Sequence, residues 1–240
     1  SSVDIYGTVM HSDGTRSSAS GVAIATGGGP QFTPAIAFNG NRYLVVWCDA
    51  GGDSVTLAGA RVTTAGVVTD TTPIPVNTFS GDHLHPAVAA MGTTFLVVWE
   101  DFRNVLTGSI DIYGARIGDD GSVLDRAGFP IGTSAGDRFA PVVAAAHSDC
   151  LVVWQDNRNL GTSASDIYGA RVTAAGTVSD LAGIALSTSP ADQTAPAVAF
   201  NGSAYGVVWA DARNADTTGL DIYGGEVSET GVLLSQNATL

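Results

Sequence analysis

The chain has 240 residues, of which 45% are apolar, so it is long enough for one sizeable core and too apolar to be a disordered tail. Its net charge of −13 would repel a nucleic-acid backbone or an anionic membrane surface. No run of about 18 apolar residues occurs, so no segment is expected to span a membrane. Charge and apolar patterning together therefore predict neither nucleic-acid binding nor insertion into a membrane.

The charged residues are of few kinds. All the basic residues are arginine, and only Glu100, Glu226 and Glu229 among the 23 acidic residues are not aspartate. Aspartate favours turns, so this usage is typical of a protein with little helix. An acidic β-protein rich in Gly, Ser, Thr and Asp predicts an extracellular or cell-surface location. Cys48 and Cys150 occupy different positions of the repeat described below, and we expect no disulfide between them.

Two motifs recur along the chain and define a repeat. A half-repeat over residues 1–28 contains Asp-Ile-Tyr-Gly at 4–7. Four full repeats follow, over 29–81, 82–136, 137–191 and 192–240, and each carries a Val-Val-Trp run, which ends at Trp47, Trp99, Trp154 and Trp209. Asp-Ile-Tyr-Gly returns at 111–114, 166–169 and 221–224, with a degenerate copy at 56–59. The tryptophans are 52 and then twice 55 residues apart, which indicates one supersecondary unit per repeat within a single domain.

Each full repeat divides into four short segments, which we name strands A to D. Strand A is Ala-rich (34–38, 86–90, 141–145 and 196–200), and strand B is the run that ends in Val-Val-Trp. Strand C begins at Asp-Ile-Tyr-Gly, and strand D is a short apolar segment (74–76, 129–131, 184–186 and 232–234). Strand B is continuously apolar, so we expect both its faces to be buried. Asn39-Gly40 between A and B and Asp120-Gly121 between C and D are typical of hairpin turns.

Four antiparallel strands per repeat predict an all-β fold, a β-propeller of four-stranded blades with strand A at the centre. The half-repeat supplies strands C and D alone, so the count is eighteen strands and the ring has four or five blades. Three arrangements fit: a five-blade ring that lacks one A–B pair, a four-blade ring with an extra hairpin, and an exchange of half-blades between chains. The last would make the half-repeat a site of self-association.

The pattern Val-Val-Trp-x-Asp-x-Arg-Asn, followed by Asp-Ile-Tyr-Gly-Ala-Arg, resembles the repeats of secreted bacterial proteins of the β-propeller type. The resemblance covers nearly the whole chain and implies a propeller fold. In overall size the chain also resembles small propeller lectins of the tachylectin and hemopexin-like kinds. It departs from other propeller families, since the Ser-x-Asp-x-Gly-x-Thr-Trp box of sialidases and the Asp-x-Asp-x-Asp-Gly calcium loop of integrin-like repeats are absent.

The loops between strands B and C are the candidate ligand-binding site. They present Asp, Arg and Asn beside an aromatic residue, a combination that can hydrogen-bond sugar hydroxyls. The candidate residues are Asp101, Arg103, Asn104, Asp156, Arg158, Asn159, Asp211, Arg213 and Asn214. In the alternative interpretation, a repeated Asp and Arg form an ion pair or a turn that only holds each loop. Gly51 replaces the arginine in the first full repeat, so a site there would be weaker or absent.

The acidic loops on the same side of the propeller suggest metal ions. Calcium could bind carboxylates that converge from several blades. The candidate ligands in the D–A loops are Asp82, His83, His85, Asp137 and Asp192. His83 and His85 would share one face of a regular strand, where they could hold a transition metal.

The same acidic residues argue against catalysis. Asp82, Asp137 and Asp192 are repeat-equivalent, whereas a glycosidase needs an acid and a base in different environments. We therefore predict a non-catalytic extracellular binding module, lectin-like, with a glycan as its ligand. Two alternatives stay open. One is a structural or interaction propeller domain that binds an extracellular protein within a larger secreted or surface protein, and the other is a glycoside-active enzyme.

Overall fold

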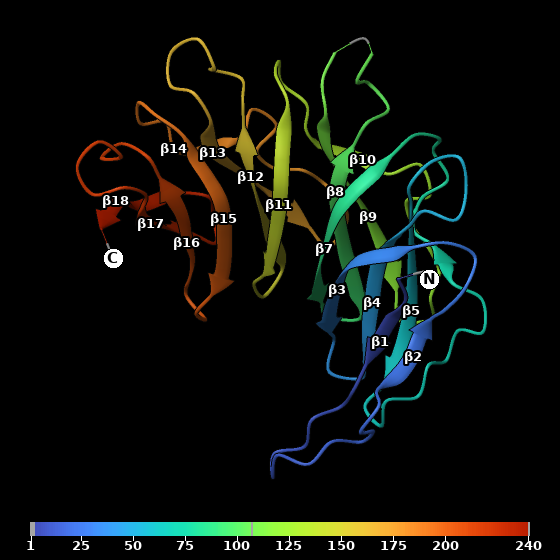
Figure 1. Cartoon of the computed structure of the whole chain (residues 1–240). Helices are drawn as coiled ribbons and strands as arrows, with labels where there is room; N and C mark the ends of the chain where they lie inside the picture. The colour runs from blue at the N-terminus through green and yellow to red at the C-terminus, as the bar shows by residue number, and fades with distance from the viewer. Residues whose placement is uncertain (1–2, 107, 240) are drawn as a thin grey trace.

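The computed structural model describes residues 3–106 and 108–239. Within these ranges the backbone forms eighteen β-strands, which pair into four four-stranded sheets and one two-stranded sheet (Figure 1). All the pairings are antiparallel, so the predicted all-β class and the four-stranded blades are confirmed. No helix in this part of the chain is long and apolar enough to cross a membrane.

The sheets follow the sequence repeats. The half-repeat pairs β1 (Ile5–Gly7) with β2 (Val22–Ala25). Blade 1 contains β3 (Gln31–Phe38), β4 (Arg42–Asp49), β5 (Thr56–Thr63) and β6 (Ile74–Pro75). Blade 2 contains β7 (His83–Met91), β8 (Thr94–Asp101), β9 (Asp111–Gly118) and β10 (Phe129–Gly132). Blade 3 contains β11 (Arg138–Ala145), β12 (Asp149–Asp156), β13 (Asp166–Thr173) and β14 (Ile184–Ser187). Blade 4 contains β15 (Gln193–Phe200), β16 (Ala204–Asp211), β17 (Asp221–Ser228) and β18 (Leu233–Thr239).

The core lies between neighbouring blades. Trp99 and Val97 of β8 pack against Leu44 of β4 in blade 1. The alternate residues of the same strand, Leu96 and Val98, pack against blade 3. Successive side chains of a strand point to opposite faces, so a strand between two blades must be apolar at every position. Each side chain of this size stabilises the fold by about 1.5–3 kcal/mol when fully buried. This explains the unbroken apolar run of strand B.

Strand A is the innermost strand of each blade. β3, β7, β11 and β15 contact one another in turn and line a common opening of about 300 Å³, which we name the axial opening. Small side chains such as Ala87 and Ala140 line it and let the four strands approach one another. The predicted central position of strand A is therefore confirmed.

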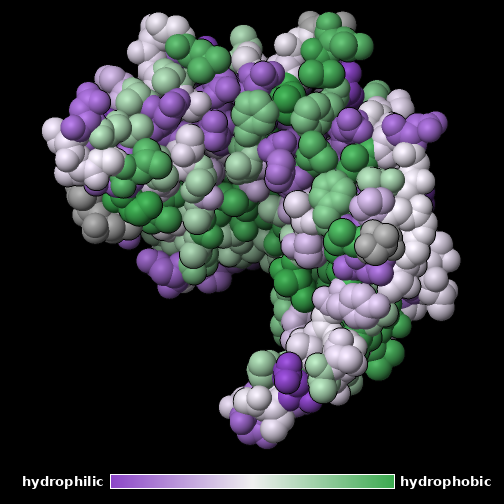
Figure 2. All heavy atoms as spheres, viewed as in Figure 1, coloured by the Kyte–Doolittle hydropathy of each residue, from purple (hydrophilic) through white to green (hydrophobic). Residues whose placement is uncertain are grey.

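The half-repeat packs against blade 1. Its Ile5 joins Val45 and Trp47 in a buried cluster. It lies at the end of the row of blades opposite β18, and an open gap separates the two ends in the space-filling view (Figures 1 and 2). β1 pairs with β2 alone, whereas the strand C of each full blade pairs on both sides. The half-repeat is thus placed as the outer half of a further blade.

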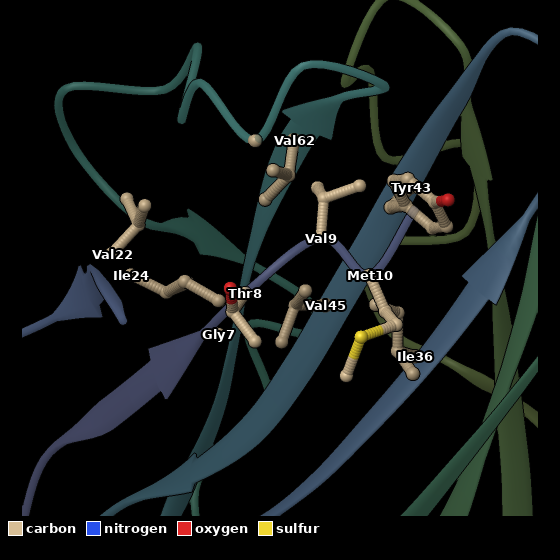
Figure 3. Close-up of a pocket in the computed structure, with 11 residues that line it drawn as sticks. Gly7, Thr8, Val9, Met10, Val22, Ile24, Ile36, Tyr43, Val45 and Val62 are labelled. Carbon is tan, nitrogen blue, oxygen red and sulfur yellow. The ribbon is translucent and has the colours of Figure 1, made fainter. Parts of the chain in front are cut away.

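An apolar pocket of about 310 Å³ marks where the inner half of that blade would lie. Val9 and Met10 of the half-repeat face Val45 and Ile36 of blade 1 across it (Figure 3). Elsewhere in the chain the corresponding face of a blade is covered by strands A and B of its neighbour.

Candidate functional site

The inner strands share an unusual backbone feature at the axial opening. In each of them the register with strand B shifts after the second residue, which is a β-bulge. Each bulge contains one residue with φ between 48° and 50°, namely Thr33, His85, Ala140 and Ala195, and a proline follows each. Residues other than glycine rarely adopt positive φ, and such strained positions cluster at functional sites.

Glu100 and His85 form a pair at this opening. His85 Nδ1 lies 3.0 Å from Glu100 Oε2, and Glu100 Oε1 accepts the backbone N–H of Ala140 at 2.7 Å. The Glu100 side chain is 4% exposed, whereas that of His85 is 57% exposed. The buried carboxylate therefore holds the exposed ring in place. In the tautomer whose Nδ1 donates to Glu100, Nε2 is the ring nitrogen that can accept a proton.

This pair occurs in one blade only. The position of Glu100 is held by Cys48 in blade 1, Gln155 in blade 3 and Ala210 in blade 4. Cys48 Sγ lies 3.1 Å from Thr33 Oγ1, so blade 1 places a thiol and a hydroxyl where blade 2 has a carboxylate and an imidazole. Burial raises the pKa of the Cys48 thiol, which keeps it protonated and a poor nucleophile.

The predicted loop residues lie farther from the axis and form a repeated contact, which we name the rim brace. Asp101 accepts two hydrogen bonds from the Arg103 guanidinium, at 2.7 and 2.6 Å, and one from Trp99 Nε1 at 2.8 Å. The guanidinium carbon lies 3.9 Å from the centre of the Tyr113 ring, a cation–π contact. A planar donor held by two carboxylate oxygens is the strong form of this ion pair.

Blades 3 and 4 repeat the rim brace. The arginine and carboxylate atoms are 2.6 Å apart in both, and the pairs are Arg158–Asp156 and Arg213–Asp211. The asparagine that follows each arginine donates to the aspartate that begins strand C, and these pairs are Asn104–Asp111, Asn159–Asp166 and Asn214–Asp221. The arginines and asparagines thus lie in the B–C loops, and the three aspartates are the last residues of the strands before them. Each arginine binds the aspartate of its own loop, and each asparagine binds the aspartate that begins strand C. Ligand binding by these nine residues stays a prediction.

The electrostatics of the rim brace are those of a structural ion pair. Burial alone would raise the pKa of Asp101, but hydrogen bonds from His83, Arg103 and Trp99 outweigh burial and hold this pKa far below its usual range. The same balance lowers the pKa of Asp156 and Asp211. These carboxylates stay ionised at neutral pH, so they cannot donate protons there.

The D–A loops tie each blade to the one before it. Asp82 Oδ1 accepts the backbone N–H of Val55 at 2.8 Å. Asp137 and Asp192 make the equivalent contacts, with the N–H groups of Ile110 and Ser165. These three aspartates therefore have the same structural role in each blade.

The two histidines of the metal prediction do not converge. His83 is fully buried, with Nε2 3.3 Å from Asp101 Oδ2, whereas His85 binds Glu100. The prediction that they share one strand face was wrong, because the bulge at His85 breaks the alternation of the strand. Among the described residues, no group of three or more His, Cys, Asp or Glu side chains is arranged to hold a metal ion. Calcium binding stays a prediction.

Comparison with known proteins relates the fold to one class of enzymes. No protein-family model matches the chain, and no curated protein matches it in sequence. The structure is similar to that of an α-L-arabinofuranosidase from Lactobacillus brevis, with a TM-score of 0.56 and 11% identity over 98% of this chain and 94% of that one. It is also similar to the Penicillium chrysogenum α-L-arabinanase complexed with arabinobiose, with a TM-score of 0.56 and 11% identity over 85% of this chain and 69% of that one. Such neighbours are five-bladed β-propeller enzymes, which confirms the propeller fold.

This comparison corrects two predictions. The sequence predicts a non-catalytic, lectin-like protein, yet several solved structures with a similar fold are glycoside hydrolases, namely α-L-arabinofuranosidases and an α-L-arabinanase. The prediction rests on the repeat-equivalent Asp82, Asp137 and Asp192. Glu100 of strand B is a further acid, and in the fold it contacts His85, which lines the axial opening.

Proposed function

We propose that the protein is a glycoside-active enzyme that hydrolyses glycosidic bonds in the axial opening. The observation that carries this proposal is the Glu100–His85 pair, a buried carboxylate that orients an exposed imidazole where the inner strands meet. All four inner strands have the bulge, but only blade 2 carries an ionisable pair at it, and a polar pair found in one blade of four serves no need of the repeat. The shared fold of the arabinoside hydrolases supports the reaction class.

The pair can move the proton that hydrolysis requires. The bond between the anomeric carbon and the leaving oxygen breaks, the oxygen of a water molecule bonds to that carbon, and one water proton ends on the leaving oxygen. Nε2 of His85 accepts this proton from the attacking water and returns it to the leaving oxygen. Glu100 is a positioning residue that also stabilises the transient imidazolium. Most glycosidases use two carboxylates that act directly on the substrate, whereas in this mechanism one imidazole, oriented by Glu100, carries out both proton transfers.

The dimensions of the opening suit a small sugar. A volume of about 300 Å³ lies at the lower end of the range for small-ligand sites. Pro34, Pro86 and Pro141 give the wall apolar surfaces for a sugar ring, and Thr33 adds a hydroxyl. Since two solved neighbours hold arabinobiose, we propose arabinofuranosides and short arabino-oligosaccharides as the substrate class.

Product analysis tests this proposal. Arabinobiose and p-nitrophenyl α-L-arabinofuranoside are incubated with the wild-type protein, with Glu100→Gln and with a control, Glu229→Gln, at a glutamate that is more than a third exposed. We expect the wild type to release arabinose. Glu100→Gln should lower kcat by about 10- to 100-fold with little change in KM, because the substrate touches His85 and not Glu100. Failure of the wild type to cleave any arabinoside, or equal rates for the two variants, would contradict the proposal.

We also propose that the protein acts outside the cell or on its surface, and that copies associate through the half-repeat. The acidic, Asp-rich composition supports the first part. The unpaired edge of β1 and the apolar pocket beside Val9 support the second. Fractionation of producing cells tests the location. Sedimentation at rising concentration should show an associating species that Val9→Asp abolishes, and a wild type that stays monomeric would contradict the association.

A further inference from the structure

Blade 1 keeps the carboxylate of the rim brace and lacks its arginine. Asp49 Oδ1 accepts the backbone N–H of Gly51 at 3.0 Å, the same turn that Asp101 makes with the N–H of Arg103 at 3.0 Å. Gly51 provides no guanidinium to bind this carboxylate. In blade 2, Tyr113 is the strand partner of the tryptophan, and in blade 1 this position is occupied by Ala58. Blade 1 therefore also lacks the aromatic ring over which the guanidinium lies in blade 2.

A cavity of about 200 Å³ lies where those side chains would be. Its wall includes Asp49, Gly27 and three residues of the segment 70–73, namely Asp70, Thr71 and Pro73. The strand pairings place Gly27 at the same repeat position as Phe79. The ring of Phe79 packs against the guanidinium of Arg103 in blade 2. Asp70 and Asp125 accept the equivalent backbone hydrogen bonds in the two blades, so the segment 70–73 corresponds to 125–128. In that second segment the carbonyl oxygen of Ala127 accepts a hydrogen bond from Arg103 Nη2. The cavity therefore coincides with the arginine site of the other blades.

Two buried polar atoms are unpartnered at this place. Trp47 Nε1 has no acceptor among the described residues, whereas the other three tryptophans each donate to the aspartate of their own rim brace. Gln31, which is 1% exposed, lies in the cavity wall, and its Oε1 also has no hydrogen-bond partner there. Gln193, the equivalent residue of blade 4, has the same unpartnered Oε1 beside a complete rim brace, so the Trp47 donor is what distinguishes blade 1. The Asp49 carboxylate in the cavity wall is an acceptor that a cationic donor would satisfy.

We propose that this cavity binds the guanidinium group of an arginine side chain from a second polypeptide. Guanidinium is planar, carries five N–H donors and no acceptor, and binds a carboxylate through two parallel hydrogen bonds. It would take the position that Arg103 holds in blade 2. Asp49 would then adopt the orientation of Asp101, which gives Trp47 Nε1 its acceptor. The net charge of −13 favours the approach of a basic peptide.

Peptide titration with matched variants tests the site. Acetyl-Gly-Arg-Gly-amide, or the same peptide with lysine, is added while the indole N–H signal of Trp47 is followed by NMR. We expect roughly millimolar affinity for the arginine peptide and about tenfold weaker binding of the lysine peptide, whose ammonium cannot bind two oxygens in parallel. Asp49→Asn should weaken arginine binding by about tenfold or more. Asp53→Asn, which removes the same charge from an exposed position of the same loop, should leave it unchanged.

A second variant fills the cavity from within. Gly51→Arg restores the residue of the other blades and should abolish peptide binding. A Cβ at Gly51 would lie 3.2 Å from the carbonyl oxygen of Gly28, so the loop must shift by a few tenths of an ångström. If this variant does not fold, the Asp49 and Asp53 variants still decide the question. Equal binding of both peptides, equal loss in the two asparagine variants, or an unmoved Trp47 signal would overturn the proposal.

Discussion

The rim and the axis of this propeller differ in whether equivalent positions carry the same residue in successive blades. At the rim, blades 2, 3 and 4 hold the same ion pair with the same 2.6 Å separation between arginine and carboxylate. At the axis, the four bulges share a φ close to 50°, yet their residues are Thr33, His85, Ala140 and Ala195. Residues that every blade needs for stability must recur, whereas residues that act once on a shared ligand need not. Identity between blades therefore indicates a structural role, and difference indicates a candidate site.

The largest expected effect comes from removing a rim carboxylate. Asp156 lies 3.3 Å from Arg138 Nε, which is fully buried, and it also binds Arg158 and Trp154. Asp156→Asn should lower the free energy of unfolding by about 3–5 kcal/mol, because it removes one of the two carboxylates that neutralise the buried Arg138, the other being Asp111, and also the acceptor of Trp154 and Arg158. Urea denaturation measures this loss. Asp49→Asn, at the same repeat position without an arginine, should cost under about 1 kcal/mol. Similar losses in the two variants would contradict the structural role of the rim brace.

A smaller effect is expected from the arginines. Arg103 is 9% exposed and lies over the rings of Phe79 and Tyr113, whereas Arg213 is 22% exposed and lies over one ring. Arg103→Ala should therefore cost about 2–3 kcal/mol and Arg213→Ala about 1–2 kcal/mol. Arabinoside turnover by the folded fraction should not change. A loss of turnover without a loss of stability would instead make the rim loops the ligand site.

The pH dependence of stability sharpens the comparison further. The folded-state pKa values of Asp101, Asp156 and Asp211 lie below the unfolded value of about 3.9. Their contribution to stability is therefore present above that value and is lost as the pH falls through the folded pKa values. The melting temperature should fall as the pH is lowered from about 5 to 2, and less steeply in Asp101→Asn than in Asp53→Asn. Equal slopes in these two variants would contradict the account.

Repeat period and apolar patterning predicted the strands, the buried tryptophans and the central position of strand A, because these features depend on local spacing. The catalytic candidate depended on a backbone feature that the pattern does not contain. Regular alternation assigned His85 to the face of His83, and only the bulge turns it toward Glu100, fifteen residues away. Acids of strand A and its flanks lie nearest the axis in the predicted blade, whereas Glu100 belongs to the neighbouring strand B and contacts the wall of the opening through His85. The one signal in the sequence was that Glu100 has no acidic counterpart in the other repeats.

The most direct test of the central claim is the initial rate of p-nitrophenyl α-L-arabinofuranoside hydrolysis by His85→Gln, compared with Arg213→Ala. Both rates are corrected for the folded fraction. A positioned proton-transfer group contributes about 10²- to 10⁴-fold, so His85→Gln should lose at least a hundredfold in kcat, while the rim variant keeps the wild-type rate. If His85→Gln kept the wild-type rate and Arg213→Ala lost it, the site would lie at the rim, and the assignment of function to the unrepeated axial residues would be wrong.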